Sequence, residues 1–113
     1  VDDKIYVLGD ATNQGDMPKS AYSANSQAKV AAMAVRAELT GSRVFPAKFS
    51  NTCWSMLGTD DGVKVGASYQ ATDEKIASVG GFISKPGESA DLRKATFQES
   101  LGWYDGITAD MFS

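Results

Sequence analysis

The chain has 113 residues, of which 42% are hydrophobic and 22% charged, as is ordinary for a globular domain. Its net charge is −3 and its basic residues are scattered, which argues against a nucleic-acid partner, and no apolar run approaches the roughly 20 residues that cross a bilayer. The absence of histidine removes the commonest metal and haem ligand, so we expect no metal site.

Residues 4–8 (KIYVL) are rich in β-branched and aromatic side chains, which predicts a short buried strand that ends at Gly9-Asp10. Glycine allows the backbone to pass close to a ligand, and a carboxylate at a strand end can accept hydrogen bonds from sugar-like hydroxyls. The same dipeptide is also a common turn. Both interpretations of Gly9-Asp10 are open at this point.

A loop leads into a long alanine-rich helix, which is expected to begin between Asp16 and Ser20 and to end at Gly41. Either Asp16 or Ser20 can cap the helix, and Pro18 suits its first turn. The exposed N–H groups of that turn stabilise negative charge, and Lys19 adds a cation beside them. The alternative for Lys19 is a solvated surface lysine.

From residue 52 onward the pattern of apolar residues has the two-residue period of β-strands. Residues 52–57 (TCWSML) and 63–71 (VKVGASYQA) predict a hairpin with a tight turn at 59–62. A third strand is expected over 75–83, where Gly80-Gly81 marks a bulge or a close backbone approach. These segments together predict a small antiparallel sheet.

Ser89 is placed to cap a last helix from about Ala90 to Leu101, which Gly102 is expected to end or bend. The predicted fold class is therefore α+β. A strand and a long helix come first, and a small antiparallel sheet with a C-terminal helix follows.

Cys53 is the one cysteine, so it cannot form a disulfide within the chain. It is a buried structural thiol, a reactive thiol, or half of a bridge to a cysteine elsewhere. Trp54, the next residue on the predicted strand, should point to the opposite face and have a structural role.

The order of strand, Gly-Asp, loop and alanine-rich helix resembles the second flavin-binding motif of flavoproteins with two dinucleotide-binding domains. The stretches MPKSAYSANSQAKVAA, NTCWSML and GWYDGITADMF resemble the flavoprotein subunit of flavocytochrome c sulfide dehydrogenase and, more distantly, sulfide:quinone oxidoreductase. The glycine-rich dinucleotide fingerprint is not among these residues. The chain therefore looks like a C-terminal piece, with residues 1–42 ending an FAD-binding domain and 43–113 forming a flavin-associated or interface domain.

The resemblance implies FAD in the full-length protein and assigns the site residues. Cys53 would be the flavin-proximal sulfur of a redox-active disulfide whose second cysteine lies upstream of this chain, and Asp10 would hold the ribityl chain. The implied cofactor-binding residues are Gly9, Asp10, Lys19, Ser20, Tyr22 and Trp103. The two aromatic residues in this set could equally belong to a core.

The resemblance also implies FAD-dependent oxidation of sulfide in the bacterial periplasm, with electrons passed singly to a c-type cytochrome subunit. The isolated chain is expected to be inactive, because half of the FAD site is not in it. One alternative is a protein like sulfide:quinone oxidoreductase, although the acidic ending LGWYDGITADMFS is a poor ligand for a membrane surface. The other is a non-catalytic subunit-docking module.

Overall fold

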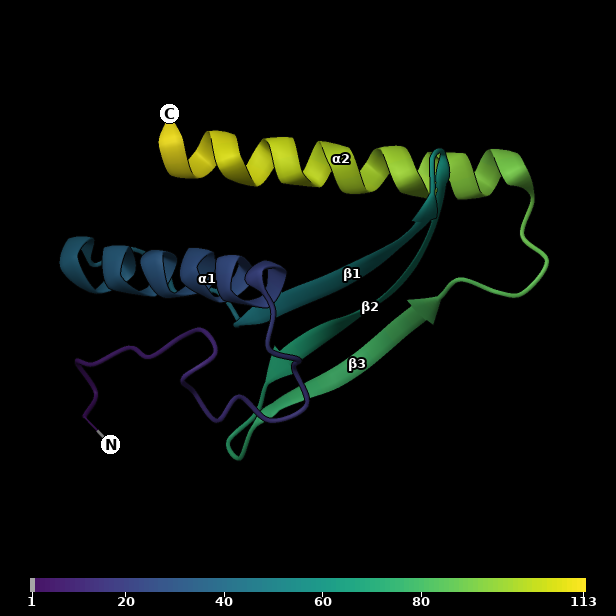
Figure 1. The fold of residues 1–113 in the computed structure, drawn as a ribbon. Coiled ribbons are helices and arrows are strands. Elements are labelled where there is room, and N and C mark those ends of the chain that lie inside the picture. The colour runs from purple at the N-terminus through teal and green to yellow at the C-terminus, as the bar shows by residue number, and fades with distance from the viewer. Residues whose placement is uncertain (1) are drawn as a thin grey trace. The chain divides into compact units, whose positions relative to one another are not determined.

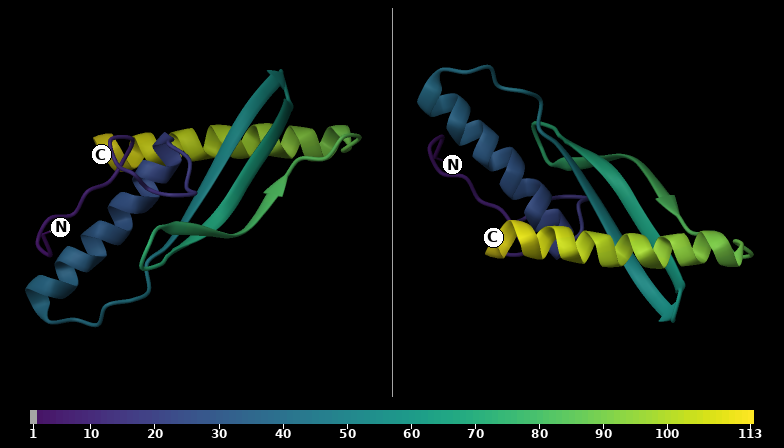
Figure 2. Two further views of the ribbon diagram at one scale, coloured as in Figure 1. Left: turned by 90° about the horizontal axis from the view of Figure 1, so that it is seen from below. Right: turned by 90° about the horizontal axis from the view of Figure 1, so that it is seen from above.

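The computed structural model describes residues 2–113, which form two long helices and one sheet of three antiparallel strands (Figure 1). The strand order is β1-β2-β3, so β2 lies in the middle, as two further views show (Figure 2). This arrangement confirms the predicted α+β class. The elements in chain order are α1 (Ala21–Thr40), β1 (Lys48–Gly58), β2 (Asp61–Ala71), β3 (Ile76–Ile83) and α2 (Ala90–Phe112).

The chain divides into two compact units. Unit 1 consists of the chain through Thr52 together with Gly66–Gly81, and unit 2 consists of Cys53–Val65 together with Phe82–Ser113. All three strands pass from one unit into the other. The predicted boundary at residue 42 concerns domains of the full-length protein and stays a prediction.

Helix α1 begins and ends at the residues that the sequence indicated. The Ser20 hydroxyl accepts a hydrogen bond from the Ser23 N–H at 3.0 Å, which satisfies one of the first-turn donors. Gly41 has φ 66°, the left-handed conformation that closes many helices. The loop that contains Asp16 is not part of the cap.

The predicted strand at residues 4–8 is wrong. The segment is drawn as an irregular trace in Figure 1, and the side chains of Ile5 and Val7 are 62% and 74% exposed. A strand requires a neighbour that takes up its backbone hydrogen bonds, and within residues 2–113 no strand pairs with this segment. High β-propensity alone does not hold it in a sheet.

The sheet follows the predicted pattern with longer strands. The β1–β2 turn consists of Thr59 and Asp60, and Asp60 has φ 58°, a left-handed value that aspartate tolerates better than most residues. A Cβ at Gly81 would lie 2.9 Å from the Gly66 carbonyl oxygen. The predicted close backbone approach at Gly80-Gly81 is therefore confirmed at its second glycine.

Helix α2 begins where it was predicted and ends eleven residues later than predicted, at Phe112 instead of Leu101. Ser89 caps it by accepting a hydrogen bond from the Leu92 N–H at 3.2 Å. Gly102 neither ends nor caps the helix. Glycine lowers helix stability by about 1 kcal/mol in a helix interior but stops a helix only where the backbone turns left-handed, and Gly102 is not among the residues with positive φ.

The buried face of α2 is lined by small polar residues rather than by a large apolar stripe. Thr96 and Ser100 are buried, and Trp103 continues this face while Tyr104 is 63% exposed. A Cβ at Gly62 of β2 would lie 3.2 Å from the Phe97 backbone, so the hairpin approaches the helix very closely. Short side chains on α2 are what this approach requires.

Candidate functional site

The Gly9-Asp10 turn lies in unit 1. Gly9 has φ 83°, which glycine adopts without strain, and a Cβ there would meet no heavy atom within 4 Å. Its N–H donates to the Gln27 Oε1 at 2.8 Å, and its carbonyl oxygen accepts from the Thr12 hydroxyl at 2.8 Å. Asp10 is exposed. The turn is thus anchored through its backbone, while the carboxylate faces solvent.

Two buried glutamines connect this turn to the entrance of α1. Gln14 is 7% exposed and Gln27 is 5% exposed, and the Gln27 amide donates to the Gln14 Oε1 at 3.0 Å. The Gln14 amide donates to the carbonyl oxygens of Met17 and Pro18 at 2.9 and 2.7 Å. The sequence reasoning treated residues 11–17 as an ordinary loop and missed these residues. The available signal was Gln27, a long amide on a helix face that it shares with Ser23, Ala24, Val30 and Ala31.

The helix entrance carries positive charge without a neighbouring acid in the first turn. Lys19 is exposed, no acidic residue lies in the first turn of α1, and Tyr22 is half-buried. Ser20 donates its hydroxyl hydrogen to the Asn51 Oδ1 at 2.6 Å, which ties the cap to β1. Among the described residues the Ser23 hydroxyl is buried without a hydrogen-bond partner.

The nearest acid in the preceding loop, Asp16, is engaged elsewhere. It accepts from the Lys75 ammonium at 2.7 Å and from the Ser78 N–H at 3.2 Å, and its own N–H donates to the Ile76 carbonyl oxygen at 2.9 Å. The Lys75 hydrogen bond, followed by that of Ser78, holds the pKa of Asp16 below its ordinary value. Asp16 therefore fixes the loop to β3 and does not neutralise the helix entrance.

A hollow of about 430 Å³ in unit 1 borders the same loop. Its lining includes the exposed segment Tyr6–Leu8, the amides of Gln14 and Gln27, and the turn between β2 and β3. It does not include Gly9 or Asp10.

Cys53 lies on β1 in unit 2 and is exposed within this chain, which favours a reactive thiol or half of a bridge over a buried structural thiol. It lines a groove of about 340 Å³ between β1, β2 and the segment that follows β3. Lys64, Lys85 and Arg93 line the groove too. The complete lining is Cys53, Ser55, Leu57, Val63, Lys64, Val65, Ile83, Ser84, Lys85, Pro86, Gly87 and Arg93.

Two of the three cations of this groove are neutralised by carboxylates. The Lys64 ammonium lies 2.5 Å from a Glu99 carboxylate oxygen, and the Arg93 guanidinium holds Asp61 through two hydrogen bonds, one of them 2.8 Å long. Among residues 2–113, Lys85 has no ion-pair partner. The Lys85 backbone N–H donates to a Glu88 carboxylate oxygen at 2.9 Å, so a third carboxylate lies beside the groove, although the Lys85 ammonium forms no ion pair with it.

Trp54 lies outside the Cys53 groove and packs on the other side of β1. Its ring centroid is 5.8 Å from that of Trp103 on α2, at an interplanar angle of 31°, and its indole N–H donates to Glu99 at 3.4 Å. The structural role expected for Trp54 agrees with this packing. Trp103 contacts Trp54 in unit 2, and its assignment to the cofactor stays a prediction.

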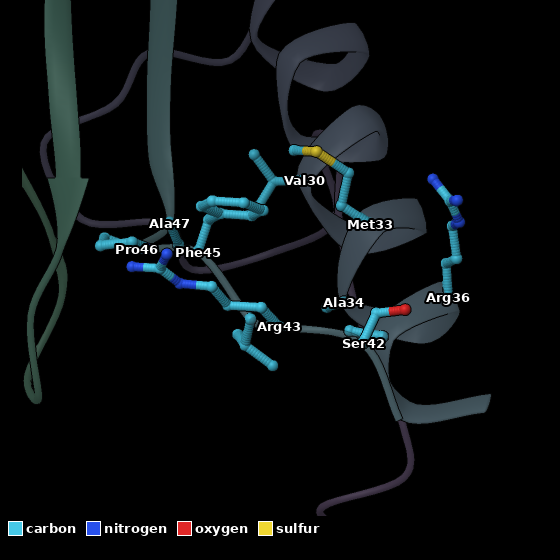
Figure 3. Close-up of a pocket in the computed structure, with 11 residues that line it drawn as sticks. Val30, Met33, Ala34, Arg36, Ser42, Arg43, Phe45, Pro46 and Ala47 are labelled. Atoms are coloured by element: carbon cyan, nitrogen blue, oxygen red, sulfur yellow. The ribbon is translucent and has the colours of Figure 1, made fainter. Parts of the chain in front are cut away.

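A further hollow, of about 290 Å³, lies between the second half of α1 and the segment 42–47 (Figure 3). The side chains of Val30, Met33 and Phe45 gather there, and the Arg43 guanidinium lies over the Phe45 ring at 5.4 Å from its centroid. Phe45 is 63% exposed. This part of unit 1 therefore presents a mostly apolar surface.

A positively charged helix entrance that follows a glycine-carboxylate turn, and an exposed thiol in a basic groove, suit a redox protein that binds an anionic cofactor. Comparison with known families gives the particular class. The family described as flavocytochrome c sulphide dehydrogenase, flavin-binding, matches residues 46–112, more than half of the chain. The chain belongs to this family.

Membership in a flavin-binding family implies FAD in the full-length protein, and the family name implies a cytochrome partner. The residues of unit 1 fit such a cofactor, since the space above Gly9 is open and no first-turn acid occupies the helix entrance. Among the described residues no helix is long and apolar enough to cross a membrane. The predicted family and cofactor are thus confirmed.

Proposed function

We propose that this chain is the C-terminal part of an FAD-dependent sulfide dehydrogenase that oxidises sulfide through a redox-active disulfide and passes electrons to a c-type cytochrome in the periplasm. The observation that carries the proposal is the exposure of Cys53 in a groove that Lys64, Lys85 and Arg93 also line, within the residues that match the flavin-binding family. A structural cysteine would be buried among apolar side chains.

In the resting state Cys53 is joined to a cysteine upstream of this chain. Hydrosulfide attacks the upstream sulfur, the S–S bond breaks, and its electron pair leaves with the Cys53 sulfur as a thiolate. The attacking sulfur remains on the upstream cysteine as a persulfide. Bound FAD supplies an acceptor for two electrons that can be returned one at a time.

The cations of the groove stabilise both anions of this step, the attacking hydrosulfide and the departing thiolate. Lys85 attracts anionic hydrosulfide and stabilises the Cys53 thiolate, because its ammonium forms no ion pair within residues 2–113. Arg93 is held in place by Asp61 and keeps the edge of the groove rigid. Both effects weaken as salt concentration rises.

In unit 1, Gly9 lets the cofactor approach the backbone and the Asp10 carboxylate accepts hydrogen bonds from its ribityl hydroxyls. Lys19, Ser20 and the N-terminal end of α1 stabilise negative charge. Tyr22 and Trp103 complete the proposed set by packing against the cofactor or excluding water. These assignments rest on positions in the sequence that the resemblance marks.

The decisive experiment uses the full-length flavoprotein with its cytochrome. Cys53→Ser should lower sulfide-dependent cytochrome reduction on the order of 10³-fold or more, because the redox-active disulfide can no longer form, and should leave the visible flavin spectrum in place. Ser55→Ala changes the same groove without touching the thiol and serves as the matched control. Unchanged reduction by Cys53→Ser would remove the proposed role of this sulfur.

The acceptor distinguishes the proposal from a function like that of sulfide:quinone oxidoreductase. Reduction of a c-type cytochrome, with no faster reduction of a soluble quinone, is the expected result. Faster reduction of the quinone would favour the alternative. The same assay with cytochrome and quinone supplied separately covers both outcomes.

Docking of the cytochrome subunit is a second candidate role, and the apolar hollow beside Phe45 favours it. Phe45→Ser should weaken association of the full-length flavoprotein with the cytochrome, as measured by sedimentation. Phe82→Ser, a change at an exposed aromatic residue of unit 2, provides the comparison. Equal association of both variants would place the docking surface elsewhere.

A further inference from the structure

We propose that Gln27, together with Gln14, is a positioning residue that holds the Gly9-Asp10 turn and the entrance of α1 in the geometry that binds FAD. The inference rests on the proposed cofactor contacts of Asp10 and Lys19. It adds two buried amides that touch neither the cofactor nor the reacting sulfur.

Burying these amides costs free energy unless every polar atom forms a hydrogen bond. Gln27 is 5% exposed, and its oxygen accepts from the Gly9 N–H at 2.8 Å. Its nitrogen donates to the Gln14 oxygen at 3.0 Å and to the Met17 sulfur at 3.4 Å. The acceptor and both donor hydrogens are engaged, so the amide has one satisfied orientation.

Gln14 extends the connection toward the helix entrance. Its nitrogen donates to the carbonyl oxygens of Met17 and Pro18, and its oxygen accepts from Gln27. The single Thr12 hydroxyl hydrogen is shared between the Gln14 oxygen at 3.0 Å and the Gly9 carbonyl oxygen at 2.8 Å. A continuous chain of hydrogen bonds therefore runs from Gly9 to Pro18, one residue before Lys19. It fixes the spacing between the two segments proposed to contact the cofactor.

A buried amide is kept at a position only where its hydrogen bonds are needed, because burying it costs free energy that an apolar side chain would not cost. Removal of the Gln27 amide would leave the Gly9 N–H without its acceptor. What an apolar residue cannot do is accept the Gly9 N–H and align it with the carbonyl oxygens before α1. Preorganisation of this kind raises affinity by lowering the ordering cost of binding.

The test is the FAD affinity of the full-length flavoprotein. Gln27→Met keeps the length of the side chain and removes its amide, and it should raise the FAD dissociation constant about tenfold, as expected when a buried N–H loses its acceptor. Amide hydrogen exchange of the peptide that contains Gly9 should become faster in the FAD-free protein. Gln98→Met, the same change at an exposed position of α2, is the control.

A merely structural role predicts a different pattern. The variant would then unfold at a lower temperature, while its folded fraction would bind FAD with wild-type affinity, and that result would overturn the inference. If Gln27→Met does not fold, Thr12→Val decides. This isosteric change removes one hydroxyl from the same chain and should weaken FAD binding a few-fold, whereas unchanged affinity would overturn the proposal.

Asp10→Ala distinguishes a failure of the positioning role of Gln27 from a failure of the proposed FAD contact. Loss of FAD affinity in Asp10→Ala with wild-type affinity in Gln27→Met would remove the positioning role and leave the proposed function standing. Wild-type affinity in Asp10→Ala would instead remove the cofactor contact on which both rest.

Discussion

In unit 1 the segment before α1 is held mainly by hydrogen bonds between buried amides, with one ion pair from Asp16 to Lys75, whereas in unit 2 the β1–β2 hairpin is held to α2 by stacked indoles and ion pairs. Buried neutral hydrogen bonds are insensitive to salt and define one geometry. Half-exposed ion pairs are weakened by salt and tolerate small shifts. The contacts of unit 1 thus depend mainly on fixed geometry, and those of unit 2 depend more on salt concentration.

Close backbone approach is a second point of comparison. In unit 1 the loop before α1 passes so near β3 that a Cβ on Gly15 would lie 2.8 Å from the Ile76 carbonyl oxygen. In unit 2, Gly62 allows a similar approach to α2 at 3.2 Å. Gly15 also has φ 73°, so a side chain at this position would meet both backbone strain and the steric contact with Ile76.

The largest effect is expected for Gly15→Ala. Backbone strain and the clash with Ile76 should together lower the stability of unit 1 by about 2–4 kcal/mol. Hydrogen exchange of the α1 amides in the purified chain measures this loss.

Gly87→Ala is the control for Gly15→Ala, because Gly87 has φ 81° but open space around its missing Cβ. Gly87→Ala should lower stability only through backbone strain, by about 1 kcal/mol. Equal losses in the two variants would show that the loop does not approach β3 as closely as described.

The next effect concerns the indole pair of unit 2. Trp54→Ala removes the contact with Trp103 and the hydrogen bond to Glu99, and should cost about 2–3 kcal/mol since the side chain is half-buried. Chemical denaturation of the chain measures the change. A double-mutant cycle with Trp103→Ala should show coupling of about 1 kcal/mol, and strictly additive losses would mean that the rings do not interact.

A smaller and salt-dependent effect is expected for Arg93→Gln. The Arg93–Asp61 pair has two hydrogen bonds, but its side chains are 33% and 37% exposed, so screening reduces its contribution to about 0.5–1 kcal/mol. The loss should diminish near 1 M salt. The same salt change should leave the effect of Gln27→Met on unit 1 unaltered, and a common salt dependence would contradict the comparison.

The sequence predicted those parts of the fold that depend on local chemistry. Ser20, Gly41 and Ser89 marked helix ends correctly, because capping is decided by a few neighbouring residues. Residues 4–8 were assigned to a strand from propensity, but a strand exists only where another strand pairs with it. The extension of α2 past Gly102 was missed, since helix pattern rules do not include the packing of Trp103 on Trp54.

The residues of the candidate site also differ in how far the sequence indicated them. Cys53 was identified by resemblance, and the structure adds its exposure and the cations around it. Gln14 and Gln27 were not found, because thirteen residues separate them and only the folded loop brings their amides together. Hydrogen bonds between distant side chains leave no periodic signal in a sequence.

The smallest expected effect is a pH dependence of unit 1 that arises from Asp16. Hydrogen bonds from Lys75 and from the Ser78 N–H lower the pKa of Asp16 below its ordinary value of 3.8, so the folded state favours the carboxylate. Its stabilisation is fully present above that value and is lost as pH falls through the lower pKa of the folded protein. In Asp16→Asn this contribution is missing at every pH.

Unfolding followed from about pH 6 to about pH 3 should therefore show wild type and Asp16→Asn converging at the acid end. Asp73→Asn, a change at an exposed carboxylate in the β2–β3 turn, serves as the control and should stay close to wild type at every pH. Parallel curves for wild type and Asp16→Asn would show that the carboxylate does not anchor the loop to β3. The close approach at Gly15 and the hydrogen bonds of the buried glutamines would then have to hold the loop without help from Asp16.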